Sequence, residues 1–98
     1  MNNQSDPMEK AVTNLGWRNK IRCGDRVIQI ASLVRASDWR PLRAEWWRGK
    51  EVCVIGAALN GDFFLRHCDG SIRLWDHKSN AESIVAKSVR EFVSRITE

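Results

Sequence analysis

The pattern of hydrophobic and polar residues is clearest in the second half of the chain, where apolar runs are separated by turn residues. Three runs there, 51–59, 62–68 and 71–77, are rich in Val, Ile, Phe, Leu and Trp, which favour strands. The dipeptides Asn60-Gly61 and Asp69-Gly70 separate these runs and fit two-residue hairpin turns, because their residues reach positive φ at low cost. The pattern predicts a three-stranded antiparallel meander.

A two-residue turn fixes which residues face each other across a hairpin. The turn at Asp69-Gly70 predicts the pairs Leu65–Leu74, His67–Ile72 and Phe63–Asp76 on one face, and Phe64–Trp75 and Arg66–Arg73 on the other. We expect the first face, together with Val54, to form the core. Two opposed arginines on the second face repel each other unless an anion or an aromatic ring lies near them. The second face therefore either binds a partner or is covered by the N-terminal segment.

Amphipathic patterns predict a helix near each end of the chain. Asp6-Pro7-Met8-Glu9 is typical of a helix start with Asp6 as the N-cap, and apolar residues follow at helical spacing: Met8, Ala11, Val12 and Leu15. Near the other end, Ser88 and Glu91 form a capping box. An apolar stripe follows this capping box: Val89, Phe92, Val93 and Ile96.

The remaining segments complete the expected fold. Residues 26–34 favour a strand after a turn at Cys23-Gly24-Asp25, and residues 82–86 favour a further short strand. Residues 37–49 fit either a short helix or an irregular loop held by its tryptophans. The fold class expected is α+β: an antiparallel or mixed meander of three to five strands, packed against a C-terminal helix and a short N-terminal helix.

Length and composition indicate a single small domain over residues 1–98, with residues 1–5 disordered. Five tryptophans and 43% hydrophobic residues favour a folded core, and 29% charged residues argue against a membrane protein. The first residues lack a cationic start followed by an apolar run, which predicts a cytoplasmic protein. The three cysteines lack Cys-x-x-Cys spacing, so we expect reduced and mostly buried thiols at Cys23, Cys53 and Cys68.

The net charge of +4 lies in the first half of the chain. Residues 1–49 hold nine Lys and Arg against five Asp and Glu, whereas residues 50–98 hold seven of each. An excess this small is typical of a solvated surface, and it leaves open an acidic partner or a nucleic acid.

The hairpin also carries potential metal ligands: His67, Cys68, Asp69, Asp76 and His77. Adjacent strand residues point to opposite faces, so we expect neither three converging ligands nor a Cys–His catalytic pair. No phosphate-binding loop, pair of catalytic carboxylates or nucleophile elbow is apparent. The sequence therefore predicts no metal, no cofactor and no enzyme activity. Asp76 and His77 are better explained as residues that bind backbone amides of the following loop.

The order of several short motifs resembles the SUKH superfamily, the Smi/Knr-like domains. The motifs are Val54-Ile55-Gly56, then 61–65 (GDFFL), Asp69-Gly70 and 72–77 (IRLWDH), and a final helix over 88–96 in which Phe92 takes the place of the family's aromatic residue. The similarity covers about residues 46–96. The longer helical region that precedes the sheet in this family, with its acidic, Leu-Pro-containing start, is absent or much degraded here.

The resemblance implies helices packed on a sheet and a non-catalytic, protein-binding function. Many such domains are immunity proteins that bind and neutralise a cognate bacterial toxin. We therefore expect an immunity-like protein that blocks a toxin enzyme sterically and electrostatically. The predicted partner-binding residues are Trp75, Arg73, Arg66, Phe64, Trp46 and Trp47. The alternative is a regulatory or nucleic-acid-associated small protein that uses the basic first half.

Overall fold

The computed structural model describes residues 7–43, 45, 47 and 51–97. Seven strands, two α-helices and one 3-10 helix follow one another along this part of the chain. Their bounds are α1 (Pro7–Thr13), β1 (Lys20–Cys23), β2 (Arg26–Leu33), η1 (Ala36–Asp38), β3 (Val52–Ala58), β4 (Phe63–His67), β5 (Ile72–Asp76), β6 (Ala81–Ala86), α2 (Val89–Ser94) and β7 (Ile96–Thr97).

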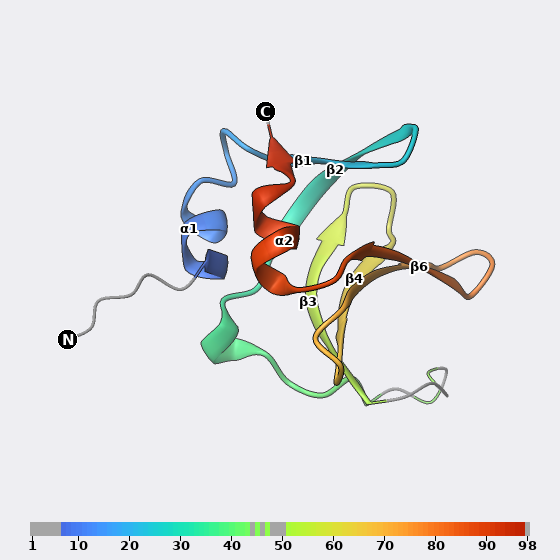
Figure 1. Ribbon diagram of the computed structural model, residues 1–98. Coiled ribbons are helices and arrows are strands. Elements are labelled where there is room, and N and C mark those ends of the chain that lie inside the picture. Colours follow the sequence, from blue (N-terminus) through green and yellow to red (C-terminus); the bar gives the residue numbers. More distant parts are fainter. Residues whose placement is uncertain (1–6, 44, 46, 48–50, 98) are drawn as a thin grey trace.

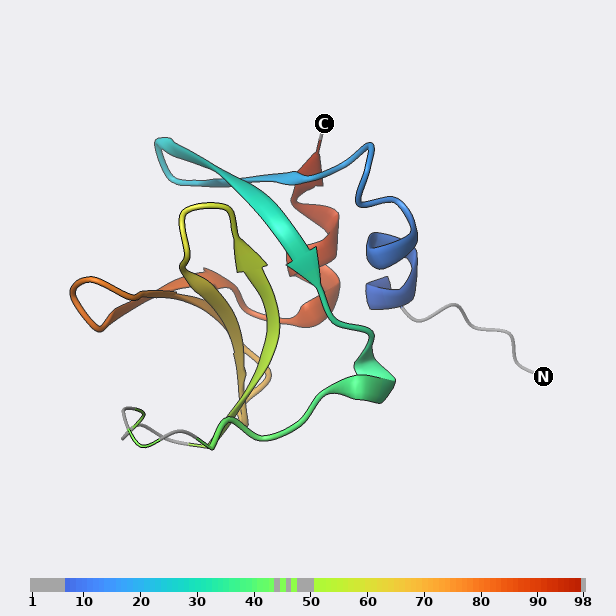
Figure 2. The same cartoon turned by 180° about the vertical axis from the view of Figure 1, so that it is seen from behind.

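The strands form one curled antiparallel sheet in the order β6-β5-β4-β3-β2-β1-β7 (Figure 1). Each of the first five strands pairs with the next one along the chain, and the chain then returns through α2 so that β7 pairs with β1. The two helices lie side by side against the concave side of this sheet (Figures 1 and 2). The α+β fold class is confirmed, with seven strands in place of the predicted three to five.

Bulges help to curl the sheet. In β3, Ile55 is an extra residue between the pairs Val54–Leu65 and Gly56–Phe64, and in β6 Val85 is an extra residue before Ala86. An inserted residue bends its strand and strengthens the local twist. In β6 the successive residues Val85 and Ala86 both join the main core, and in β3 the extra residue Ile55 does.

The predicted pairing of β4 with β5 is wrong by one residue, because the turn between these strands has three residues. The amide of His67 donates to the carbonyl of Ser71 and the amide of Gly70 donates to the carbonyl of His67, so 68–70 form the loop. Gly70 has a φ of 90°, as a three-residue turn of this kind requires. The turn before β4 is built in the same way, with Gly61 at a φ of 98°.

The shift changes every predicted pair. Phe64 pairs with Leu74 and Phe63 pairs with Trp75, whereas Leu65 pairs with Arg73 and Arg66 pairs with Ile72. Arg66 and Arg73 therefore project from opposite faces of the sheet. The predicted repulsion between two facing arginines does not arise.

Both faces of the central strands are buried, each in its own cluster. The main core fills the concave side and joins the two helices to the sheet; its bulkiest members are Met8, Ile21, Ile55, Phe64, Ile72 and Phe92. The rings of Phe64 and Phe92 lie 5.2 Å apart. A second cluster on the convex side contains Val52, Leu65 and Trp75, with Leu42 and Trp47 packed against it. The predicted core face (Leu65, Leu74, Ile72 and Val54) is thus divided between the two sides.

The segment after β2 and the last helix differ from the elements that the sequence predicts. Beyond η1, the described residues of the 37–49 segment are not helical, and Trp39 instead donates from Nε1 to the carbonyl of Val34 at 2.8 Å. This bond agrees with the alternative of a loop held by its tryptophans. The last helix ends at Ser94, so Ile96 is buried as part of β7 and not as part of the helix stripe. The predicted N-cap Asp6 lies outside the described residues.

The cysteines are all free thiols, as predicted. Cys23 and Cys53 are half-buried, whereas Cys68 lies in the turn after β4 and is exposed. The expectation that the thiols are mostly buried is therefore wrong.

Candidate functional site

The predicted partner-binding residues do not form one surface in the structure. Phe64 is fully buried in the main core. Arg66 projects to the same side, and its guanidinium lies 5.6 Å from the centre of the Trp39 ring. This cation–π contact stabilises the loop after β2 against the sheet. Both side chains therefore have structural roles.

The convex side holds the rest of the predicted set. Trp75 is only 7% exposed and stacks on Phe63 with ring centroids 5.8 Å apart. Trp47 is half-buried beside it, and Trp46 lies outside the described residues. Among the described residues, Leu42 and Trp47 from the first half of the chain pack against the cluster that contains Trp75. Arg73 is partly exposed, and its Nε donates to the hydroxyl of Ser71.

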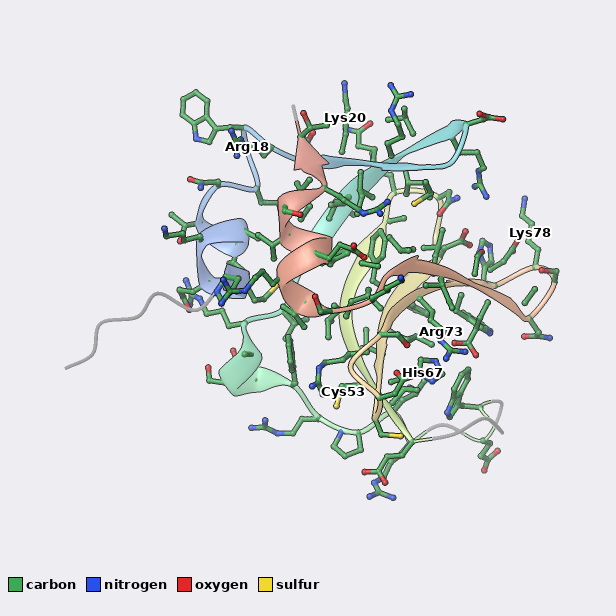
Figure 3. The ribbon with its side chains drawn as sticks, in the orientation of Figure 1. Arg18, Lys20, Cys53, His67, Arg73 and Lys78 are labelled. Carbon is green, nitrogen blue, oxygen red and sulfur yellow. The ribbon has the colours of Figure 1, made fainter. Side chains whose placement is uncertain are left out.

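A buried histidine lies beside Arg73 on this convex side (Figure 3). His67 is 4% exposed, and its Nε2 lies 2.5 Å from a carboxylate oxygen of Glu82 on β6. Its Nδ1 has no hydrogen-bond partner among the described residues. The contact between His67 and Glu82 links β4 to β6 across β5.

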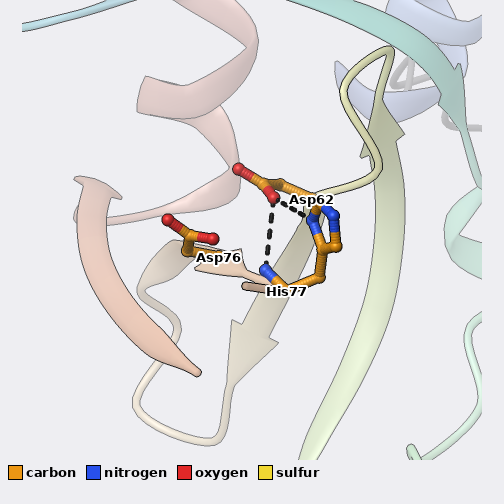
Figure 4. A group of neighbouring side chains, drawn as sticks. All are labelled: Asp62, Asp76 and His77. Atoms are coloured by element: carbon orange, nitrogen blue, oxygen red, sulfur yellow. Dashed lines mark hydrogen bonds and ion pairs between the residues drawn. The ribbon is translucent and has the colours of Figure 1, made fainter. Parts of the chain in front are cut away.

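Asp62, Asp76 and His77 form the group that most resembles a metal site, because their ligand atoms lie within 4.8 Å of one another (Figure 4). Asp62 is nearly fully buried and its Oδ1 accepts two hydrogen bonds from His77, from the backbone amide at 3.2 Å and from Nδ1 at 2.7 Å. The other carboxylate oxygen accepts from Asn60 at 3.2 Å.

These bonds give the group a structural explanation. The carboxylate of Asp62 is occupied by donors of the chain, and it ties the turn before β4 to the turn after β5. Asp76 accepts from the amide of Lys78 at 2.8 Å, which holds the pKa of Asp76 below its ordinary value. The predicted role of Asp76 is confirmed, whereas His77 binds Asp62 and not the following loop.

A hollow of about 250 Å³ lies where the curled sheet stays open, and we call it the edge cleft. The β1–β2 hairpin forms one wall with Cys23, Arg26 and Ile28; Leu74 and residues 83–85 of β5 and β6 form the other. Arg95, directly after α2, closes one end. Figure 1 shows the β1–β2 hairpin at the top of the view and β6 below it.

Apolar side chains are unusually exposed around the edge cleft. A second hollow adjoins it, shares Arg26 and Ile28, and is lined also by Val27 and Leu59. Val27, Leu59 and Ile84 are exposed to 56%, 62% and 65% of their surface. Ile84 lines the edge cleft, and Val27 and Leu59 line the second hollow. Several exposed apolar residues beside hollows are typical of a binding surface, whereas single exposed ones are ordinary.

The charges at the edge cleft are positive. Among the described residues that line it, the charged ones are Arg26 and Arg95. Both guanidinium groups favour the thiolate of Cys23, but the loss of hydration on burial is larger, so the pKa of this thiol is raised. The site therefore lacks an activated nucleophile, and its chemistry is that of a basic, partly apolar binding cleft.

The sequence held few signals for this site. Lys20–Cys23 has only four residues and alternates charged and apolar side chains, and it was not predicted as a strand. Without it, the open side of the sheet has no second wall. The Cys23-Gly24-Asp25 turn was the one available sign that a strand precedes residue 26.

No protein-family model, curated protein or solved structure matches this chain. The SUKH resemblance therefore stays a prediction that rests on the quoted motifs. Among the described helices, none has the length and apolar character needed to cross a membrane.

Proposed function

We propose that this protein is a non-catalytic, protein-binding domain of the cytoplasm, and that it neutralises a bacterial toxin as an immunity protein does. The observation that carries the proposal is the group of exposed apolar residues around the edge cleft: Val27, Leu59 and Ile84. Exposure of these apolar side chains to water is unfavourable. A partner that covers them removes this apolar surface from water, which makes the free energy of binding more favourable. The SUKH-like order of motifs supports the choice of a toxin as partner.

Binding to a toxin is tested with a toxin encoded beside this gene. We expect the two proteins to co-purify and the toxin to lose its activity in the complex. Ile84→Lys should weaken the complex about ten-fold or more, because a charge would replace an apolar contact residue. Trp17→Ser removes an apolar side chain that is even more exposed than Ile84 but does not line the cleft, and it should leave binding unchanged. A toxin that remains active in excess of this protein would refute the proposal.

A second candidate function is nucleic-acid binding by the basic first half. The specific observation is that Trp17 is 76% exposed and is followed by Arg18 and Lys20, which Figure 3 shows near each other at one end of the molecule. Exposed aromatic rings beside cations bind single strands by stacking. Such binding weakens log-linearly and steeply as salt rises, whereas a toxin complex depends on salt much less. Titration with a labelled oligonucleotide at several salt concentrations separates the two functions.

A further inference from the structure

The outer edge of β6 is an open strand edge. β6 pairs with β5 on one side, and no strand within the described residues pairs with its other side. Residues 81–84 keep a regular register with β5, and the strand contains neither proline nor lysine, which often protect such edges. Its free backbone amides and carbonyls are therefore available to another extended segment.

The opposite wall of the edge cleft is also an incompletely paired strand. Residues 26–29 of β2 pair with β1, and strand pairing of β2 with β3 begins only at Ile30. Ile28 and Leu74 face the cleft from its two sides. A hollow of about 250 Å³ between two such walls admits the side chains of an extended segment but not a folded domain.

The charge of the cleft selects the chemistry of that segment. Among the described residues Arg26 has no ion pair, and Arg95 has a long, exposed one with Glu91 at 3.8 Å. Two cations near one end of an apolar cleft favour acidic side chains that alternate with apolar ones. A second copy of this chain would bring the same two arginines to the contact, which disfavours pairing of β6 with itself.

We propose that the partner binds by adding an extended acidic segment to the outer edge of β6, with apolar side chains in the edge cleft and acidic ones at Arg26 and Arg95. The proposal rests on the protein-binding function given above and specifies how the partner is recognised. Main-chain hydrogen bonds to β6 provide affinity in this mode, and the side chains provide specificity.

Two blocked hexapeptides test the proposal without the toxin. One alternates glutamate with valine and the other alternates lysine with valine. We expect the acidic peptide to slow hydrogen exchange at the β6 amides that point away from β5 and to shield the thiol of Cys23 from alkylation. The lysine peptide should do neither. Nuclear magnetic resonance of the whole chain reports the exchange, and mass spectrometry distinguishes Cys23 from Cys53 and Cys68.

Charge-reversal variants identify the site. Arg26→Glu combined with Arg95→Glu should weaken the acidic peptide about ten-fold. Arg22→Glu is the matched control, because Arg22 lies on the same hairpin, is exposed and does not line the cleft. A spectrum that keeps its dispersion shows that each variant is folded.

The proposal is overturned if both peptides protect β6 equally, if neither does, or if the β6 amides that point away from β5 are already protected in the free protein. A dimer that forms on raising the concentration, with protected β6 amides, would show that a second copy occupies the edge. If the chain neutralises a toxin but ignores the acidic peptide, the protein-binding function stands and the strand-addition proposal falls.

Discussion

β3 lies close to β2 at Gly56, and this close packing of the two strands is possible because Gly56 has no side chain. A Cβ atom there would lie 2.8 Å from Cδ2 of Leu33 and 2.8 Å from the carbonyl oxygen of Ser32. Because one of these atoms belongs to the backbone, the two strands would have to separate. We expect Gly56→Ala to lower the free energy of unfolding by about 2 kcal/mol, measured by urea denaturation. Gly16→Ala, at a site with open space, should change it little. Equal effects of both substitutions would contradict the packing argument.

Asp62 is the residue whose hydrogen bonds hold two turns together. We expect Asp62→Ala to destabilise the fold by about 2 kcal/mol, because the backbone amide and the ring nitrogen of His77 lose the buried carboxylate that accepts their hydrogen bonds. Asp62→Asn should cost less, since an amide oxygen still accepts one of these bonds. In a double-mutant cycle with His77→Ala, the two losses should not add. Additive losses would show that the two residues act independently.

Helix α2 depends on its first turn, because it contains only six residues. The hydroxyl of Ser88 accepts from the amide of Glu91 at 3.1 Å, and the carboxylate of Glu91 accepts from the amide of Lys87 at 2.7 Å. The predicted capping box is thus present, with the carboxylate bound one residue earlier than the N-cap. Ser88→Ala should cost about 1 kcal/mol in urea denaturation, and Ser88→Thr should restore most of it. An unchanged midpoint in Ser88→Ala would mean that packing of Phe92 alone fixes the helix.

The strands were predictable where apolar runs and turn residues coincide, as between residues 51 and 77. Their register was not, because Asp69-Gly70 fits a two-residue turn and also the last two positions of a three-residue turn. Only the hydrogen bonds of His67 decide between these turns. Since side chains alternate along a strand, this one-residue difference moved Phe64 away from Trp75 and divided the predicted site. The same limit applies to the edge cleft, whose walls come from segments about fifty residues apart.

The whole molecule has apolar clusters on both sides of its central strands. The core on the concave side includes residues of both helices, and residues of the loop before β3 pack against the cluster on the convex side. Strands that are buried on both faces have nearly continuous apolar sequences. The sequences of β4 and β5 were therefore weak evidence that one face of these strands is exposed. In this arrangement the open side of the curl, and not a sheet face, remains for binding.

The convex cluster leads to a last prediction that separates structure from function. Trp75→Ala removes a ring that is 7% exposed and stacked on Phe63, and we expect it to cost about 4 kcal/mol, a large share of the stability of a small domain. Arg73→Glu, on the same strand but more accessible than Trp75, should leave the fold intact, and so should Trp17→Ala at the most exposed of the described tryptophans. Circular dichroism during thermal unfolding measures all three. If Trp75→Ala unfolds near the wild-type temperature yet fails to bind a toxin, Trp75 belongs to the binding surface, and the edge cleft does not account for recognition alone.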